Sequence, residues 1–460
     1  MTRRNCLPVR WQIAILSLLG MTVAFALRCN LGAAKPRMLD RFKDGHGHWH
    51  EAVFNWSTSK ISLVESAFFY GYAVAQLPAG LLAAKLPPHY IFGTGVLIAS
   101  ILNISIPLLL ARKRDVLDNL VVAIEIGQGL SLGVLFPALQ AIWRCWAPPH
   151  ERSQLITTSF GGIYLGTIIG FPASALLVSY VNWWAPFYAI GVVGIIWSVT
   201  WLICSSSSPS QHRWISREEA EFIAESIGAQ QVENFKLSEV PWRSLFLSLP
   251  VWAVCICNFA RNWAVFMLMT NQITFFKDAL HISVQVVRTH VSSSRTAYLQ
   301  GGFLSAIPSV LTFVCIVGFG RLADYLRSRG KPSVPLTRKL YILIGTLQRR
   351  LNASDEILGF LGEGTFYVIL AFTTNPAGAV ALLVIASGFA GLSSAAFQVN
   401  IFDIAPRYAP ILVGLSNGFA SISGAGIFIT EHMTNNVWLE AENISILLFR
   451  NLLVGAAVFF

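Results

Sequence analysis

Apolar runs of about 18 residues or more recur along this whole chain of 460 residues. As a helix, each run is long enough to cross the ~30 Å of hydrocarbon in a bilayer. Backbone polar groups in lipid must be hydrogen-bonded internally, so we expect each run to be an α-helix. Charged residues make up only 12% of the chain, whereas soluble proteins carry about 25%. The sequence therefore predicts an all-α protein that crosses a membrane many times.

A polar stretch at residues 205–249 separates two apolar halves, residues 1–204 and 250–460. Within it, Ser216 and Glu219 have the spacing of a capping box, which predicts a short amphipathic helix. We expect six spans in each half, with an incomplete twelfth helix because the last apolar run is short. The expected spans are residues 11–27, 61–84, 90–110, 116–143, 155–180, 186–204, 250–276, 301–323, 357–372 (after an interrupted start at 339), 377–402, 411–429 and 444–460.

Basic residues indicate how the chain is oriented in the membrane. They gather in the N-terminal segment, in the loop at 143–153, in the 205–249 loop and in residues 321–339. Basic loops stay in the cytoplasm, which predicts that both termini and the 205–249 loop face it. The basic run at 112–114 opposes this assignment. A glycosylation sequon at Asn55 suits the opposite, luminal or extracellular, side.

Several function classes lack support in the sequence. We find no nucleophile–base pair, metal cluster or phosphate loop, so we expect neither an enzyme nor a cofactor. The net charge of +10 does not indicate nucleic-acid binding, because the basic residues lie in short loops. His46, His48 and His50 alternate in the first loop and would share one face of a strand. A metal site there is the alternative to a solvated loop without a role; we assign no metal.

Glu65 and Glu125 are carboxylates that lie inside expected spans. A carboxylate in hydrocarbon costs at least ~3 kcal/mol, so it usually faces a polar cavity or a partner. Desolvation favours the protonated form, which makes both residues candidates for carrying a coupling proton. The alternative for Glu125 is a place near the helix end, within reach of lipid headgroups.

Two arginines extend the same argument to positive charge. Arg261 falls deep within the expected seventh span, where a guanidinium needs an anion, a cavity or a carboxylate. Glu125 or Glu65 is the partner we expect for it in the empty protein. Arg28 follows the first span, whose helix we expect to stop at Lys35 and Pro36. The alternative for Arg28 is therefore snorkelling to the interface.

Longer motifs add a family resemblance. The two halves, with Gly-x-Leu-Ala-Asp-x-x-Arg at 320–327, resemble the major facilitator superfamily, whose halves rock around a midplane site. More specific runs resemble the anion:cation symporters, the family of sialin, vesicular glutamate and sodium–phosphate transporters. Residues 157–164 and 258–263 look closest to the vesicular glutamate branch. The specific runs are Trp143-x-x-Trp-Ala-Pro-Pro-x-Glu-Arg-Ser153, Arg28-Cys-Asn-Leu-Gly32, Phe68-Phe-Tyr-Gly-Tyr72, Gln76-Leu-Pro-Ala-Gly80 and Asn400-x-x-Asp-Ile-Ala-Pro-Arg-Tyr-Ala409.

The resemblance implies an anion site made by arginines of spans 1, 4 and 7. A guanidinium stays charged and grips a carboxylate with two parallel hydrogen bonds. Arg28 and Arg261 are present, and we place Tyr72 and Asn400 with them as substrate-binding residues. At the span 4 position Glu125 replaces the arginine. The family's other glutamate and its histidines are replaced by Leu132, Gln140, Glu65 and Ile401.

Other charged residues are expected to be structural. Glu151, Arg152, Asp324 and Arg327 are predicted to latch the cytoplasmic ends of helices. Three segments have no counterpart in the family pattern and are insertions or splicing artefacts: residues 286–300, 348–358 and 439–451. We expect the first of them to be dispensable.

Two hypotheses for function follow. The first is a secondary active transporter of small anions, such as glutamate, sialic acid or phosphate, in a vesicle, lysosomal or plasma membrane. It would be coupled to H⁺, Na⁺ or the membrane potential, and we expect a monomer. The second is a receptor or scaffold that has lost transport, which the substitution at Glu125 and the interrupted ninth and short twelfth spans favour.

Overall fold

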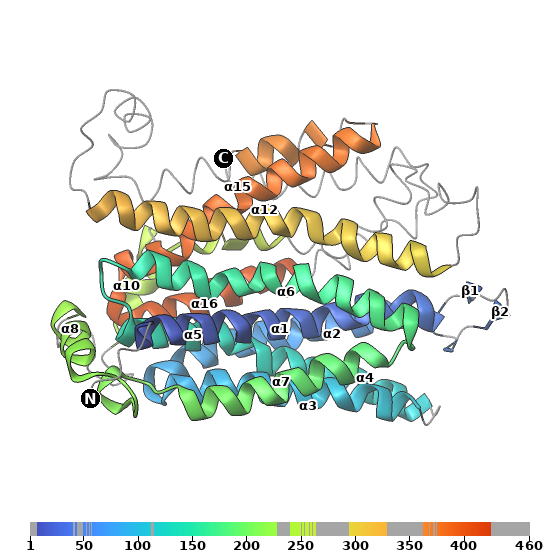
Figure 1. The fold of residues 1–460 in the computed structure, drawn as a ribbon, viewed down its shortest axis with the longest axis horizontal. Helices are drawn as coiled ribbons and strands as arrows, with labels where there is room; N and C mark the ends of the chain where they lie inside the picture. Colours follow the sequence, from blue (N-terminus) through green and yellow to red (C-terminus); the bar gives the residue numbers. More distant parts are fainter. Residues whose placement is uncertain are drawn as a thin grey trace.

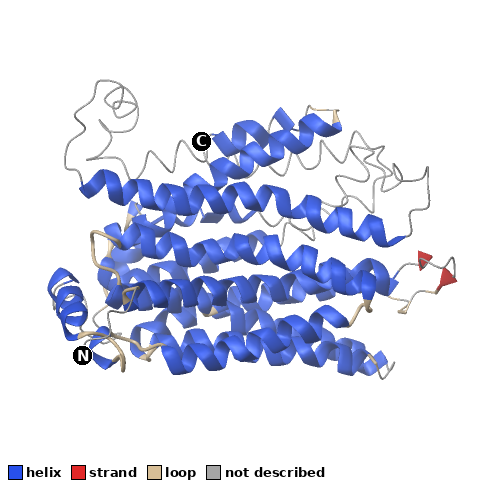
Figure 2. Cartoon of the chain, viewed as in Figure 1, coloured by secondary structure: helices blue, strands red, loops and turns tan. Residues whose placement is uncertain are grey.

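The protein is a bundle of long helices that run side by side (Figures 1 and 2). The computed structural model describes residues 7–39, 42–43, 49–51, 53–54, 56, 58–111, 115–227, 240–249, 251–252, 254–256, 258–259, 261–263, 294–328, 362–367, 369–370, 373 and 375–424. Within these residues, seven helices are long and apolar enough to cross a membrane. The all-α membrane fold expected from the apolar runs is therefore confirmed.

The N-terminal half is described almost completely. One turn residue, Val134, separates α4 from α5 within the expected fourth span; its backbone keeps helical dihedral angles, and residues 119–146 form one apolar span. The helices of this half are α1 (Val9–Leu39), α2 (Thr58–Lys85), α3 (Pro88–Leu110), α4 (Asp115–Gly133), α5 (Leu135–Trp146), α6 (Arg152–Tyr180) and α7 (Ala185–Cys204).

One expectation for this half is wrong. α1 does not stop at Lys35 and Pro36 but continues to Leu39. A proline costs a helix one backbone hydrogen bond, yet membrane helices tolerate it where neighbours satisfy the freed group. Beyond α1 comes a small hairpin of β1 (Phe42–Lys43) and β2 (Trp49–His50), whose strands pair antiparallel.

The polar stretch and the C-terminal half follow. The capping box is seen in part, because the backbone N–H of Glu219 donates to Ser216 Oγ (3.2 Å) at the start of α8. α12 begins at Ser294, so residues 294–300 form its first turns and not an interruption before it. The elements are η1 (Pro209–Gln211), α8 (Arg217–Ile227), α10 (Trp242–Leu247), α12 (Ser294–Ser328), α15 (Pro376–Ile404), η3 (Pro406–Tyr408), α16 (Ala409–Ser421) and η4 (Ile422–Gly424).

Small residues let helices of the N-terminal half pack closely. Gly162, Gly166 and Gly170 are four residues apart and form one stripe of α6 against α1. A Cβ at Gly166 would lie 2.6 Å from the Thr22 carbonyl oxygen, so only glycine permits this approach. Stripes of small residues are typical of packed membrane helices, where dispersion replaces the hydrophobic effect as the main attraction.

A buried polar network joins four helices of the same half. Asn30 of α1 donates to Asn103 Oδ1 of α3 (3.3 Å) and accepts from Ser174 of α6 (3.0 Å). Asn103 in turn donates to the Phe187 carbonyl oxygen of α7 (2.7 Å). Buried amides need such partners, so the network fixes how these helices meet.

Besides the packing of α6 against α12, the two halves touch near one end of the bundle. This end, which we call the α8 end, carries the start of α1, the turn between α5 and α6, and α8 (left in Figure 1). There, a Cβ at Gly80 of α2 would lie 2.7 Å from the Pro410 carbonyl oxygen of α16. One at Gly414 of α16 would lie 2.6 Å from the Gln76 carbonyl oxygen of α2. The halves therefore meet backbone to backbone at this end.

Candidate functional site

Arg261 joins the two halves inside the bundle. It is half-buried, and the described residues between 251 and 263 are helical. Its Nη2 donates a hydrogen bond to the Tyr164 hydroxyl of α6, 2.7 Å away. The same hydroxyl lies 2.9 Å from Oγ of Ser394 on α15. A cation that sequence reasoning placed deep in a span is therefore held at a polar junction of three helices.

Asn258, three residues before Arg261, sets the orientation of this helix. Its Nδ2 donates to Ser416 Oγ (3.0 Å) and to Asn417 Oδ1 (2.7 Å) on α16. Asn258 is 4% exposed, so loss of these partners would leave a buried amide unsatisfied. The bonds fix the rotation of the helix and thereby direct Arg261 towards α6.

Glu363 is a site residue that the sequence analysis did not identify. It lies in the helical residues 362–367 and is only 4% exposed. Its carboxylate interacts electrostatically with Arg261 and with Tyr367, one turn later. The rule applied to Glu65 and Glu125, a carboxylate within an expected span, would have found it.

Arg28 occupies a different environment, an aromatic one. Its guanidinium lies over three phenyl rings, 4.5 Å from the centroid of Phe68 and 5.3 Å from those of Phe25 and Phe69. Tyr72 stacks on Phe68 at 5.8 Å and interacts electrostatically with Arg28. Ring faces attract a cation strongly where water is scarce. Arg28 therefore does not snorkel; α1 holds it inside the bundle.

The carboxylates Glu125 and Glu65 do not pair as expected. Glu125 is 6% exposed on α4 and interacts electrostatically with Arg28. Glu65 accepts a hydrogen bond from Lys35 Nζ at 2.7 Å. The expectation that one of them is the partner of Arg261 is therefore wrong, because Arg261 donates its hydrogen bond to Tyr164. The bond joins the last turns of α1 to the first turns of α2.

Glu151 lies at a junction of helix ends, and its role as a cytoplasmic latch stays a prediction. Arg10, at the start of α1, donates to both carboxylate oxygens of Glu151, at 2.8 and 3.0 Å. It also donates to Glu219 of α8 at 2.9 Å. The hydrogen bond from Arg10 holds the pKa of Glu151 below its usual value. Arg10 and Glu219 were not identified from the sequence, because their meeting depends on the tertiary fold.

The remaining predicted residues lie at helix ends or outside the described residues. Arg152 is half-buried at the start of α6. Asp324 and Arg327 lie in the last turns of α12 and Asn400 lies in α15, but their side chains are outside the described residues. Asn55, His46, His48 and residues 348–358 and 439–451 also lie outside them, as does the whole expected twelfth helix at 444–460. Within the described part of the chain, no cluster of His, Cys, Asp or Glu is placed to hold a metal ion.

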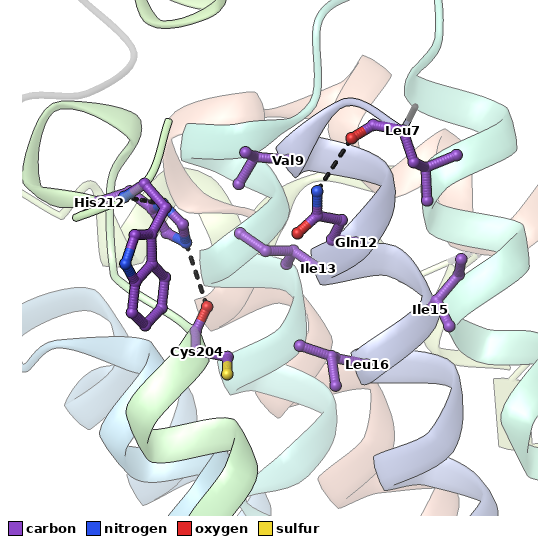
Figure 3. A pocket seen from close by; sticks show the side chains of 9 residues that line it. Leu7, Val9, Gln12, Ile13, Ile15, Leu16, Cys204 and His212 are labelled. Atoms are coloured by element: carbon purple, nitrogen blue, oxygen red, sulfur yellow. Dashed lines mark hydrogen bonds between the residues drawn. The ribbon is translucent and has the colours of Figure 1, made fainter. Parts of the chain in front are cut away.

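A hollow lies at the α8 end, between α1 and the chain that follows α7 (Figure 3). It has a volume of about 330 Å³ and is lined mainly by apolar side chains such as Ile13 and Leu16. Its edge is tied by a bond from the His212 ring to the Cys204 carbonyl oxygen (3.1 Å). It contains no charged lining residue, so it does not suit a small anion.

Sequence comparison agrees with this arrangement. The profile of the Major Facilitator Superfamily matches residues 13–428. The potential vesicular glutamate transporter vglu-3 of Caenorhabditis elegans is 43% identical over 426 residues, which cover 93% of this chain and 73% of that protein. Human vesicular glutamate transporter 2 is 36% identical over 464 residues, which cover 99% of this chain and 74% of that protein.

Solved structures share the fold. The proton:xylose symporter XylE superposes with a TM-score of 0.63 at 14% identity, covering 97% of this chain and 94% of its own. An inward-facing bacterial homologue of the lysosomal transporter Spinster gives 0.61 at 16%, covering 98% and 96%. The chain therefore belongs to the major facilitator superfamily and, within it, to the anion:cation symporter branch that contains the vesicular glutamate transporters.

Proposed function

We propose that this protein is a secondary active transporter of small organic anions, with glutamate as the first substrate to test. The observation that carries the proposal is the hydrogen bond from Arg261 to Tyr164, which joins the two halves inside the bundle. The relatives named as vesicular glutamate transporters suggest the substrate and a vesicle membrane. In this fold, halves that rock apart around a central site expose it to alternate sides.

The chemistry of the site suits a carboxylate. A guanidinium offers two parallel N–H groups to a carboxylate, and in a site of low dielectric constant such charge-assisted bonds are strong. Tyr164 and Ser394 supply hydroxyl groups beside it. Arg28, held by three rings, provides a second cation on the side of the N-terminal half. We include Tyr72 and Asn400 in the proposed site as substrate-binding residues.

Orientation and coupling are part of the proposal. The α8 end would face the cytoplasm, because the basic loops predict this and Arg10 and Arg144 lie there. H⁺ or Na⁺ would drive uptake, with Glu125 and Glu65 as coupling candidates near Arg28. Gln at each position tests this, and a pH profile of uptake unchanged in both variants would remove them. We propose a monomer, without enzymatic activity or a cofactor.

The test of transport is uptake by proteoliposomes. Labelled L-glutamate, sialic acid and phosphate would be offered to the wild type and to Arg261→Lys, which keeps the charge but loses the two-pronged geometry. Lysine should reduce uptake strongly. Arg217→Lys is the matched control, because Arg217 is 91% exposed on α8. Uptake that survives in both Arg261→Lys and Arg261→Ala would place the anion site elsewhere.

The rival function is a receptor or scaffold without transport, which Glu125 at an arginine position of the family favours. The proteoliposome uptake assay distinguishes the two functions. A folded wild-type protein that binds an anion but neither accumulates nor exchanges it would support the rival.

A further inference from the structure

A continuous chain of hydrogen bonds runs from Arg261 through α6 to α15. Arg261 Nη2 lies 2.7 Å from the Tyr164 hydroxyl, and that hydroxyl lies 2.9 Å from Oγ of Ser394. Ser394 Oγ in turn bonds to the carbonyl oxygen of Ala390, one turn earlier in α15. Ser394 is only 1% exposed, so bonds within the protein must satisfy its hydroxyl.

The direction of each bond in this chain follows from the donors that are present. A carbonyl oxygen only accepts, so the single proton of the Ser394 hydroxyl is donated to Ala390. Ser394 can then only accept from Tyr164, whose own proton is thereby used. A guanidinium only donates, so Tyr164 accepts the bond from Arg261. The Tyr164 hydroxyl therefore has no proton left to offer a substrate, and it serves Arg261 as an acceptor.

The helix that carries Tyr164 is fixed against the C-terminal half. Thr157, Gly161 and Tyr164 are spaced four and three residues apart, which places them on one face of α6. A Cβ at Gly320 of α12 would lie 1.9 Å from Thr157 Oγ1, and one at Gly161 would lie 3.1 Å from the ring of Phe313 on α12. Contacts this close fix the distance between the two helices and, with it, the position of the Tyr164 hydroxyl.

We propose that Tyr164 is a positioning residue that orients Arg261 for the substrate carboxylate, and that Ser394 acts through Tyr164. A guanidinium presents pairs of N–H groups along two edges, and each hydrogen of Nη2 belongs to one of them. The bond to Tyr164 engages one of these hydrogens, and the other edge can grip a carboxylate with two parallel bonds. A guanidinium that is oriented in advance loses less freedom on binding, which favours a low KM. This inference rests on the proposed transport function.

Tyr164→Phe tests the hydroxyl, because it keeps the ring and removes the acceptor. Uptake of labelled L-glutamate by proteoliposomes should show a KM about tenfold above the wild-type value, the size expected for losing one hydrogen bond to a charged group. The maximal rate per folded protein should stay close to that of the wild type, since the lost interaction acts on binding. Tyr90→Phe is the matched control, because Tyr90 is 54% exposed on α3, and its KM should equal the wild-type value.

Variants of Ser394 separate this role from a general structural one. Ser394→Ala leaves Tyr164 without its acceptor and should raise KM, whereas Ser394→Thr keeps a hydroxyl and should restore most of the wild-type KM. In the double variant of Tyr164→Phe with Ser394→Ala, KM should equal that of Tyr164→Phe alone, because Ser394 acts through the tyrosine. Ser387→Ala is the matched control, since the Ser387 hydroxyl donates within α15, to the Leu383 carbonyl oxygen.

The outcomes are distinguishable. Wild-type protein that neither takes up nor exchanges L-glutamate would overturn the transport function and this inference with it. Active wild type with an unchanged KM in Tyr164→Phe, or with a loss confined to the maximal rate, would overturn the inference alone, as would additive changes in the double variant. If Tyr164→Phe does not fold, Ser394→Ala and Ser394→Thr decide, and an equal KM for these two variants would contradict the proposal.

Discussion

Arg10 and Glu219 are 209 residues apart in the sequence, and they meet through two hydrogen bonds. Glu219 accepts from the Arg10 side chain at 2.9 Å and from its backbone N–H at 3.3 Å. It also accepts from the backbone N–H of Val9 at 3.0 Å. A carboxylate of α8 therefore caps the first turn of α1, where free N–H groups and the helix dipole favour negative charge.

Glu219→Ala should detach α8 from α1. Loss of a cap typically costs about 1–2 kcal/mol of stability. The detergent-purified variant should unfold at a lower temperature, and protease should cut the chain around α8 faster than in the wild type. Glu218→Ala is the control, since Glu218 is the exposed neighbour on the same helix. Equal melting temperatures and cleavage rates for the two variants would show that the cap is not needed.

Stability should also depend on the protonation of Glu151. Its pKa is lowered in the folded protein by the hydrogen bond from Arg10. The ionised group therefore contributes stability above its unfolded pKa of about 4.3, and this contribution is lost as pH falls through the lower folded pKa. The melting temperature should drop on acidification over that range, and less steeply in Glu151→Gln. Parallel curves for wild type and variant would argue against the linkage.

Asn30 should be sensitive to truncation. Replacement by Ala removes a partner from Asn103 and from Ser174, both of which are buried. An unsatisfied buried polar group costs about 1–3 kcal/mol. Asn30→Ala should therefore lower the melting temperature of the purified protein by several degrees. Thr94→Ala, at an exposed position of α3, serves as the control, and a similar small change in both would contradict the role of the network.

The segment at 286–300 should divide into two parts in deletion experiments. Residues 294–300 belong to α12, so their loss shortens a long helix by about two turns. We expect that deletion to reduce the yield of folded protein in size-exclusion chromatography. Residues 286–293 lie outside the described residues, and we keep the prediction that they are dispensable. Equal yields for the two deletions would show that the start of α12 tolerates loss.

The hydropathy pattern of the sequence predicted most of the membrane spans, but it did not predict which polar side chains bond to one another. Hydropathy located the spans because solvation by lipid acts on each segment separately. It misplaced the end of α1. Proline ends many isolated helices, but α1 continues through Pro36 to Leu39. The charged residues were found one at a time, but Arg261 with Tyr164 and Arg10 with Glu219 depend on helices brought together by the fold. Glu363 was within reach of the same rule that selected Glu125.

The contact between Gly414 of α16 and the backbone of Gln76 has a consequence for the balance between conformations. Dispersion contacts of this kind fade when the surfaces separate by an ångström or so, and they cost little to break. A methyl group is a different matter, because a Cβ at 414 would sit 2.6 Å from the Gln76 carbonyl oxygen. Gly414→Ala would penalise only the state in which these helices touch. A penalty of about 1.4 kcal/mol turns equal populations into ten to one. A single added methyl group at position 414 would thus determine the side of the membrane to which the central site of the resting protein is open.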